Sequence, residues 1–206
     1  AASDVYKRQM YQRDPEEITV QAKEENKPDI AQYRIDVGQN DKAHVMAQII
    51  RAEGHERVMA FCNTKGMTER LKAFLMMEGL EADCIHGDIP QKKREAVMAR
   101  FRRGELPIFV ATDVAARGID VDDVDCVINY DVPEENEYYV HRIGRTGRAK
   151  KKGVAWSIVS NFPEKARLDD ICKYCNFTIQ PMVMDKDGSL TPEEVKAPVT
   201  PKRRFR

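Results

Sequence analysis

The sequence lacks the features that mark several broad classes of protein. No run approaches the roughly 18 consecutive apolar residues that span a bilayer, and the first residues lack the order of a signal peptide. The five cysteines are scattered and odd in number, which argues against a disulfide framework. Neither sign of charge dominates, since 34 Lys and Arg residues balance 34 Asp and Glu residues. We therefore expect a soluble, cytoplasmic protein with no membrane partner and no uniformly basic surface.

Short apolar runs alternate with helical stretches through most of the chain. The expected strands cover residues 33–37, 58–61, 82–85, 108–111, 124–128, 154–159 and 177–180. Helical stretches of about 10 to 15 residues separate most of them, and Gly54 and Gly104 stand where two of these stretches should end. Parallel strands joined through helices place those helices on both faces of the sheet. We therefore predict an α/β fold, a mostly parallel β-sheet with helices on both faces.

The two ends of the chain lack this pattern. Residues 1–28 show little apolar periodicity, so we expect a linker or the edge of a neighbouring domain there. Beyond Pro181 the periodicity fades into a proline-containing segment that ends in two arginines, a phenylalanine and a further arginine. Such a segment buries too little apolar surface to become ordered. The predicted organisation is one domain over residues 29–181 and a flexible basic tail over residues 182–206.

Two loops that follow expected strands carry groups suited to phosphate. In parallel sheets, ligands bind at the carboxyl ends of the strands. The segment His86–Arg94 leads into a helix start crowded with cations, where free N–H groups and the helix dipole favour anions. The segment Thr112–Asp120 offers a hydroxyl and a guanidinium, with Gly118 to allow close approach and Asp120 to accept from a sugar hydroxyl. Taken alone, the first segment is better explained as a solvated helix start. In the second, ordinary helix caps explain Asp113 and Asp120 equally well.

A third loop has an arrangement that a surface charge run does not explain. In Tyr138–Arg148 the arginines recur every three residues, with Gly144 and Gly147 between them. The spacing places Arg142 and Arg145 on one helical face. Guanidinium groups that converge in this way repel one another unless an anion separates them. The loop therefore predicts a site for a polyanionic ligand.

These loops together resemble the conserved motifs of one family. Ala111–Asp120 and His141–Arg148 are similar to motifs V and VI of DEAD-box RNA helicases of the bacterial type. Val58–Thr64 resembles motif IV, and His86–Arg94 resembles the element that follows it. The histidine that begins motif VI distinguishes this branch from DEAH-type relatives. The resemblance covers residues 29–181 and implies a RecA-like fold for the helicase C-terminal domain.

The resemblance covers the second half of such a helicase only. The chain has neither a G-x-x-x-x-G-K-[ST] phosphate loop nor an Asp-Glu-Ala-Asp sequence. Residues 14–20 resemble the end of the preceding RecA-like domain, so residues 1–28 would be that end and a linker. In this family ATP and RNA bind across the cleft between two RecA-like domains, and Mg²⁺ would be held by the N-terminal one. The resemblance therefore implies that this fragment alone is inactive and monomeric, with the N-terminal RecA-like domain as its partner.

The resemblance assigns ATP-related roles to five residues. Arg145 and Arg148 resemble the arginine fingers that reach the γ-phosphate and act in catalysis. Asp120, together with these two arginines, resembles the part of the ATP site that this domain supplies. His141 and Arg142 resemble residues that couple the nucleotide cleft to the facing domain and to RNA.

The resemblance assigns RNA-related roles to a second group. Gln91, Arg94, Thr112 and Gly118 resemble the surface that holds single-stranded or structured RNA by its backbone, independently of base sequence. Phe61 would pack beneath motif VI and fix its arginines. We expect no metal ligands in this chain, because its one C-x-x-C pair, Cys172–Cys175, has no second pair or nearby histidines.

Two alternatives to a helicase half remain open. The chain could be a stand-alone RNA-binding or regulatory module that kept the fold and lost catalysis. A phosphate loop and an Asp-Glu-Ala-Asp sequence upstream in the gene would favour the helicase over that module. A DNA translocase is disfavoured by the histidine of motif VI and by the residues of motif V, Thr112–Asp120.

Overall fold

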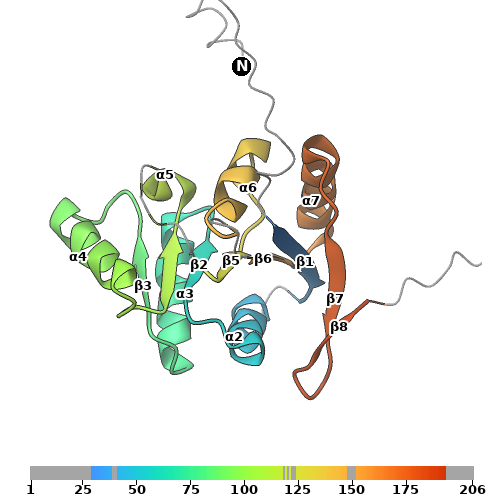
Figure 1. Cartoon of the computed structure of the whole chain (residues 1–206), viewed down its shortest axis with the longest axis horizontal. Helices are drawn as coiled ribbons and strands as arrows, with labels where there is room; N and C mark the ends of the chain where they lie inside the picture. The colour runs from blue at the N-terminus through green and yellow to red at the C-terminus, as the bar shows by residue number, and fades with distance from the viewer. Residues whose placement is uncertain are drawn as a thin grey trace, which may run out of the picture.

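The computed structural model describes residues 29–38, 41–117, 119, 121, 124–147 and 152–193. One eight-stranded sheet runs through the domain in the order β3-β4-β2-β5-β6-β1-β7-β8 (Figure 1). All neighbouring strands are parallel except β7 and β8, which are antiparallel. The strands are β1 Ile30–Asp36, β2 Val58–Phe61, β3 Ala82–Ile85, β4 Ile108–Ala111, β5 Cys126–Asn129, β6 Gly153–Val159, β7 Gln180–Met184 and β8 Leu190–Pro192.

The helices form a layer on each face of the sheet. They are α2 Lys42–Glu53, α3 Lys65–Met77, α4 Gln91–Arg102, α5 Asp113–Ala116, α6 Asn136–Ile143 and α7 Phe162–Cys175. Apolar residues of α2 and α3 pack in one core cluster, and those of α4, α5, α6 and α7 pack in a second (Figure 1). The α/β fold predicted from the sequence, with a mostly parallel sheet between two helical layers, is confirmed.

The alternation of side chains along the buried strands explains why two cores form. In β2, Val58 and Ala60 belong to the cluster under α2 and α3, whereas Met59 and Phe61 belong to the opposite cluster. All four residues are buried, because a strand in the middle of a parallel sheet is covered on both faces. Strands β4 and β5 show the same complete burial. Continuous apolar runs are the expected sequence of such strands.

The far edge of the sheet differs from the prediction. The expected strand at residues 177–180 is wrong, because β7 begins only at Gln180, which pairs with Tyr33 of β1. The expected flexible tail is also wrong for residues 182–192, which form β7 and β8 around a turn in which Gly188 has φ +85°. Phe177 and Ile179 pack against the core instead of pairing. The remainder of that tail, from residue 194, and residues 1–28 lie outside the described residues.

Within the described ranges, no helix has both the length and the apolar character needed to cross a bilayer.

Candidate functional site

A cavity opens at the carboxyl ends of the central strands. Its volume is about 270 Å³, and it is lined by Phe61, Asp113, Ala116, Arg117, Tyr138, His141, Arg142 and Arg145. Phe61 is the last residue of β2, and Asp113 begins α5 directly after β4. The other lining residues come from α5, from α6 and from the turns after these helices. We call this hollow the cationic cavity, because three of its eight lining residues are arginines.

Arg142 forms the floor of the cationic cavity and is almost fully buried. Its Nε and Nη2 donate to the two carboxylate oxygens of Asp113, each at 2.7 Å. Its Nη1 donates to the Asn129 side chain at 3.3 Å and to the Asp131 carbonyl at 2.6 Å. The second Nη2 hydrogen bond goes to Asn63 Oδ1 at 2.9 Å. All five N–H groups of the guanidinium therefore have partners within this chain.

The position of Arg142 changes the interpretation of the third loop. Its counter-charge is Asp113 of the same chain, so this arginine needs no external anion. Phe61 lies beneath it, with the guanidinium carbon 5.1 Å from the ring centroid. The predicted packing of Phe61 under motif VI is confirmed. The expectation that Arg142 and Arg145 share a helical face is wrong, because α6 ends at Ile143.

Arg145 lies in the turn after α6, at the mouth of the cationic cavity. Its backbone N–H donates to the Arg142 carbonyl, and its Nη1 donates to the Ile119 carbonyl at 2.7 Å. The adjacent Thr146 is buried, and its hydroxyl donates to the Val124 carbonyl. These hydrogen bonds attach the turn to the segment before β5. The Arg145 side chain is half-buried, so its position is fixed by the surrounding residues. The other predicted finger, Arg148, lies outside the described residues.

Three further side chains complete the wall of the cationic cavity. The Arg117 guanidinium carbon lies 5.1 Å from the Tyr138 ring centroid, and its Nη2 donates to the Tyr138 hydroxyl at 2.8 Å. His141, predicted to couple the cleft to the facing domain, is exposed at the cavity wall. Sequence reasoning had named the guanidinium of the Thr112–Asp120 loop, which is Arg117, as a possible phosphate donor, but it missed Tyr138. A signal for Tyr138 existed, since it stands three and four residues before His141 and Arg142 on the same helical face.

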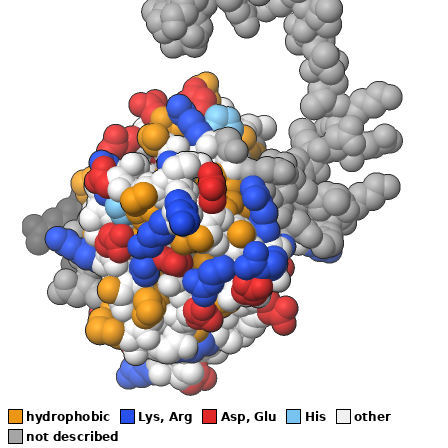
Figure 2. All heavy atoms as spheres, turned by 90° about the vertical axis from the view of Figure 1, so that its left-hand side faces the viewer, with side chains coloured by type: hydrophobic (Ala, Val, Ile, Leu, Met, Phe, Trp, Pro, Cys, Tyr) orange, Lys and Arg blue, Asp and Glu red, His pale blue; other side chains and the backbone are white. Residues whose placement is uncertain are grey.

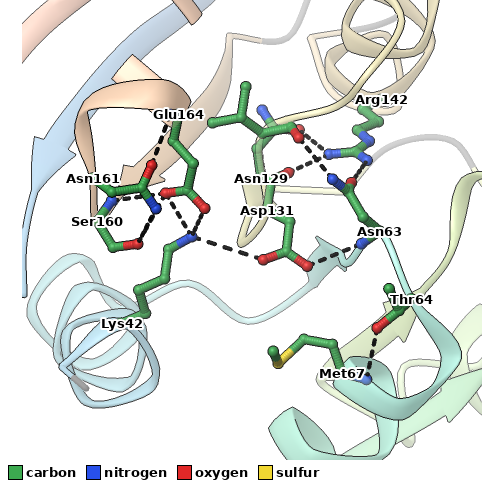
Figure 3. A network of polar contacts seen from close by, with 11 residues as sticks. Lys42, Asn63, Thr64, Met67, Asn129, Asp131, Arg142, Ser160, Asn161 and Glu164 are labelled. Carbon is green, nitrogen blue, oxygen red and sulfur yellow. Dashed lines mark hydrogen bonds and ion pairs between the residues drawn. The ribbon is translucent and has the colours of Figure 1, made fainter. Parts of the chain in front are cut away.

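A polar network continues from the floor of the cationic cavity to the far helices (Figure 3). Asp131, in the loop after β5, accepts from the backbone N–H of Asn63 at 2.9 Å. Its other carboxylate oxygen lies 3.7 Å from Nζ of the buried Lys42, which also donates to Glu164 at 2.9 Å. Glu164 in turn accepts from the backbone and the hydroxyl of Ser160. We call this chain of contacts the Lys42 network, and it links α2 and α7 to Arg142.

Of the residues predicted to hold RNA, Thr112 and Arg94 both contact Ala115. Thr112 caps α5 by accepting from the Ala115 N–H at 3.4 Å, and Arg94 Nη2 donates to the Ala115 carbonyl at 3.1 Å. The loop after β4 and the start of α4 are therefore joined. Gln91 is exposed one turn earlier, with its amide donating to Glu95 at 2.8 Å. Gly118 and Asp120 lie outside the described residues.

The face that carries α4 and α5 has a mixed charge distribution. Figure 2 shows basic side chains gathered near the middle of this face, with acidic side chains between and around them. This pattern agrees with the equal numbers of basic and acidic residues in the sequence. Binding at this face therefore depends on where individual cations stand rather than on a uniform positive field.

No described cysteine beside the cationic cavity is activated as a nucleophile. Cys62 directly follows Phe61 and is buried. Burial, followed by the nearby charge of Asp131, raises the pKa of its thiol well above the ordinary value. The thiol is therefore protonated at neutral pH, which excludes it as a thiolate nucleophile.

The fold and the site together define an α/β domain with arginines at the carboxyl edge of a parallel sheet. A family model described as Helicase conserved C-terminal domain matches residues 41–150. The chain therefore belongs to the helicase C-terminal domain family, and it is of the type found in DEAD-box RNA helicases.

Individual relatives agree with this assignment. The DEAD-box ATP-dependent RNA helicase CshA of Bacillus cereus is 41% identical over 150 residues, which are 73% of this chain and 29% of CshA. The ATP-dependent RNA helicase DbpA of Bacillus subtilis is 44% identical over 170 residues, 82% of this chain and 35% of DbpA. The chain thus spans about a third of the length of these curated relatives.

Solved structures show the same fold. The C-terminal domain of the DEAD-box protein Dbp5 superposes with a TM-score of 0.72 at 32% identity, over 78% of this chain and 94% of that domain. The structure of S. cerevisiae Dbp5 bound to RNA and ADP BeF3 matches with a TM-score of 0.78 at 30% identity. That match covers 89% of this chain and 49% of the Dbp5 chain.

Proposed function

We propose that this chain is the C-terminal half of an ATP-dependent RNA helicase. In this proposal the chain contributes Arg145 and Arg148 to the triphosphate of ATP and Asp120 to the nucleotide site. It offers the loops after β3 and β4 to the RNA backbone. The observation that carries the proposal is the cationic cavity at the carboxyl edge of the sheet. The relatives that cover the chain are named as ATP-dependent RNA helicases, and the chain matches about a third of each.

The charges of the cationic cavity suit a nucleotide phosphate. Its one carboxylate, Asp113, is already neutralised by Arg142. Arg145 uses one N–H group on Ile119 among the described residues, which leaves further donors for an anion. Guanidinium groups bind phosphate oxygens through two parallel hydrogen bonds, so Arg145 can grip a terminal phosphate. A positive group in this place stabilises the charge that develops during phosphoryl transfer.

The same cavity does not suit a magnesium ion. Mg²⁺ needs oxygen ligands such as free carboxylates, and both oxygens of Asp113 accept from Arg142. The described lining therefore holds the phosphate and leaves the ion to the partner domain. His141 lies exposed at the same wall, where a second domain that closes on the cavity would meet it. This arrangement supports the proposed coupling role of His141, with Arg142 positioning the wall from below.

The RNA surface in this proposal uses the joined loops after β3 and β4. Arg94 lies four residues after Pro90 at the start of α4, where its guanidinium is half-buried against Ala115. Gln91, Thr112 and Gly118 belong to the same two loops. Backbone phosphates and 2′-hydroxyls are the groups that such donors recognise, so binding would be independent of base sequence. The structure of Dbp5 that matches this chain is described as bound to RNA.

A comparison of two protein preparations tests the proposed function. We expect this chain alone to hydrolyse no ATP above a blank, with or without RNA, because the phosphate loop is absent from it. We expect the complete protein that contains this chain to show ATP turnover that rises with RNA. Turnover by the isolated chain, or a complete protein that binds RNA without hydrolysis, would contradict the proposal. The second result would favour the stand-alone RNA-binding module.

A further inference from the structure

Three side chains with metal-ligating atoms meet at the edge of the sheet, outside the cationic cavity. Glu69 comes from α3, Cys84 from β3, and His86 from the loop directly after β3. His86 Nε2 lies 3.0 Å from Glu69 Oε1, and the ligand atoms of all three residues lie within 4.8 Å of one another. No other group of three such residues comes together in the part of the chain that the structure describes.

The local structure explains why these three residues converge. Cys84 and His86 are two positions apart along an extended segment, so their side chains point to the same face. Helix α3 packs against β3 on that face and carries Glu69. Cys84 is fully buried and His86 nearly so, whereas about half of the Glu69 side chain is exposed. The group is therefore anchored from inside and open to solvent on one side.

A hydrogen bond already joins two of the three metal-ligating side chains. The Glu69 carboxylate shares a hydrogen bond with His86, which is the main cause of its lowered pKa. The Asp88 backbone N–H donates to His86 Nδ1 at 3.4 Å, so the ring carries its proton on Nε2. Burial, followed by the charge of Glu69, raises the pKa of Cys84 to about 12. Without a metal ion, Glu69 and His86 are therefore joined by a hydrogen bond, and the Cys84 thiol is protonated beside them.

We propose that Glu69, Cys84 and His86 form a binding site for one divalent transition-metal ion of the Zn²⁺ type. A carboxylate oxygen, a thiolate and an imidazole nitrogen are the ligand types that Zn²⁺ takes, with water in an open fourth position. One thiolate and one carboxylate balance the charge of the ion. The expectation of no metal ligands rested on the Cys172–Cys175 pair. Sequence spacing does not reveal this group, because Glu69 stands 15 residues before Cys84 in the chain.

The protonation changes on binding can be written in full. The Cys84 thiol releases its proton to solvent and the thiolate bonds to the ion. His86 binds through Nε2, so its single proton moves to Nδ1 and the long contact from Asp88 is given up. Glu69 keeps its charge and exchanges its hydrogen bond with His86 for a metal bond. Because one proton leaves, affinity should rise with pH.

The ion would act on the loop that leads to α4. His86 begins this loop, and Asp88 in the same loop forms an ion pair with Lys65 Nζ of α3 at 2.5 Å. A metal bond to His86 would fix the start of the loop more firmly than the present hydrogen bond to Glu69. The site therefore offers a way to stiffen the segment that positions Gln91 and Arg94, although its occupancy does not depend on the proposed function.

Titration of the untagged chain with Co²⁺ tests this proposal. Cobalt bound to a thiolate gives a charge-transfer absorption band that carboxylate or histidine sites do not give, and Zn²⁺ should displace it. We expect one equivalent of Co²⁺ per chain. Glu69→Gln, a change at a half-exposed side chain that should not disturb folding, should weaken binding by at least about tenfold. Cys84→Ala should remove the thiolate band.

Matched variants separate this site from the remaining cysteines. The double variant Cys172→Ser and Cys175→Ser removes the C-x-x-C pair, and Cys126→Ala removes a cysteine as buried as Cys84. Both should bind Co²⁺ as the unaltered chain does. The proposal is overturned by an absent thiolate band in the unaltered chain, by unchanged affinity in Glu69→Gln, or by loss of the band in the double variant. If Cys84→Ala fails to fold, Glu69→Gln decides.

Discussion

Asp113 and Arg142 form a bidentate ion pair beneath the cationic cavity, with both hydrogen bonds at 2.7 Å. Asp113 begins α5 and Arg142 lies in the last turn of α6, so the pair ties the loop after β4 to the helix before Arg145. The side chain of Arg142 is 1% exposed and that of Asp113 is 15% exposed. The pair therefore holds two of the sequence motifs in register from inside the protein.

Breaking this pair should be costly. Asp113→Asn leaves the buried guanidinium without its counter-charge, and such changes lower the free energy of unfolding by about 3 kcal/mol or more. Urea unfolding of this chain measures the effect. The matched control is Glu105→Gln, which breaks the exposed bidentate pair with Arg103 and should leave the unfolding midpoint unchanged. Equal effects of the two substitutions would show that burial does not set the strength of the pair.

The Lys42 network makes a second prediction. Lys42→Met should lower the free energy of unfolding by about 2 kcal/mol, because Glu164 and Asp131 lose the cation between them. This expected loss of stability is smaller than for a fully buried ion pair, because both carboxylates remain partly exposed to solvent. Lys165→Met, which removes an exposed pair with Asp36, should change it by less than about 0.5 kcal/mol. A Lys42→Met protein as stable as the Lys165→Met protein would refute a structural role for the network.

Two glycines with the same backbone conformation should respond differently to alanine. Gly54 (φ +68°) and Gly147 (φ +69°) both adopt the left-handed region. A Cβ at Gly54 meets nothing within 4 Å, so Gly54→Ala should cost about 1 kcal/mol from backbone strain alone. A Cβ at Gly147 would lie 2.6 Å from Ile30 Cγ1 and 3.2 Å from the Asp29 carbonyl. Gly147→Ala should therefore cost at least about 1 kcal/mol more in urea unfolding.

The gap between these two glycine variants tests how motif VI packs. Gly147 lies against the start of β1, so its small size lets the turn after Arg145 sit close to the sheet. Equal losses in the two variants would mean that this close approach is absent.

The proposed RNA contact of Arg94 predicts a change in salt dependence. In the complete protein, Arg94→Ala should weaken binding to two unrelated single-stranded RNAs equally and reduce the salt slope by roughly 0.7. Arg103→Ala, at the other end of α4 and paired with Glu105, should leave the slope unaltered. Titrations at several salt concentrations give both numbers. A loss that depends on the RNA sequence, or an unaltered slope for Arg94→Ala, would remove this loop from the RNA path.

Much of the central sheet could be predicted from the sequence because local pattern and tertiary environment agree there. The strands at residues 58–61 and 108–111 have the predicted bounds, since each is a short apolar run covered on both faces. The edge strand at residues 82–85 also has the predicted bounds, although it contains the partly buried Asp83. The strand at the far edge was misplaced for the opposite reason. Met182 and Met184 alternate with the exposed Val183 over only five residues, and the pairing partner is nearly 150 residues away in the chain. Such a weak pattern becomes a strand only when β1 is beside it.

The site shows the same division between local pattern and tertiary contact. Spacing and motif resemblance led to His141, Arg142 and Arg145, which all line the cationic cavity. They did not reveal that the Arg142 guanidinium already donates hydrogen bonds to Asp113 and Asn63, because these partners are 29 and 79 residues away in the chain. The partner of Arg117, Tyr138, was missed because the interaction of a guanidinium with a ring depends on how α5 and α6 pack.

The central claim is that Arg145 acts on the phosphate of ATP rather than on RNA. Steady-state ATP turnover at saturating RNA by the complete protein carrying Arg145→Ala, measured beside RNA affinity, tests it most directly. We predict that turnover falls by about 10³-fold or more, whereas RNA affinity stays within about twofold. Arg51→Ala, at an exposed arginine of α2 far from the cavity lining, should change neither quantity. A variant that keeps its turnover and loses RNA affinity would contradict the account.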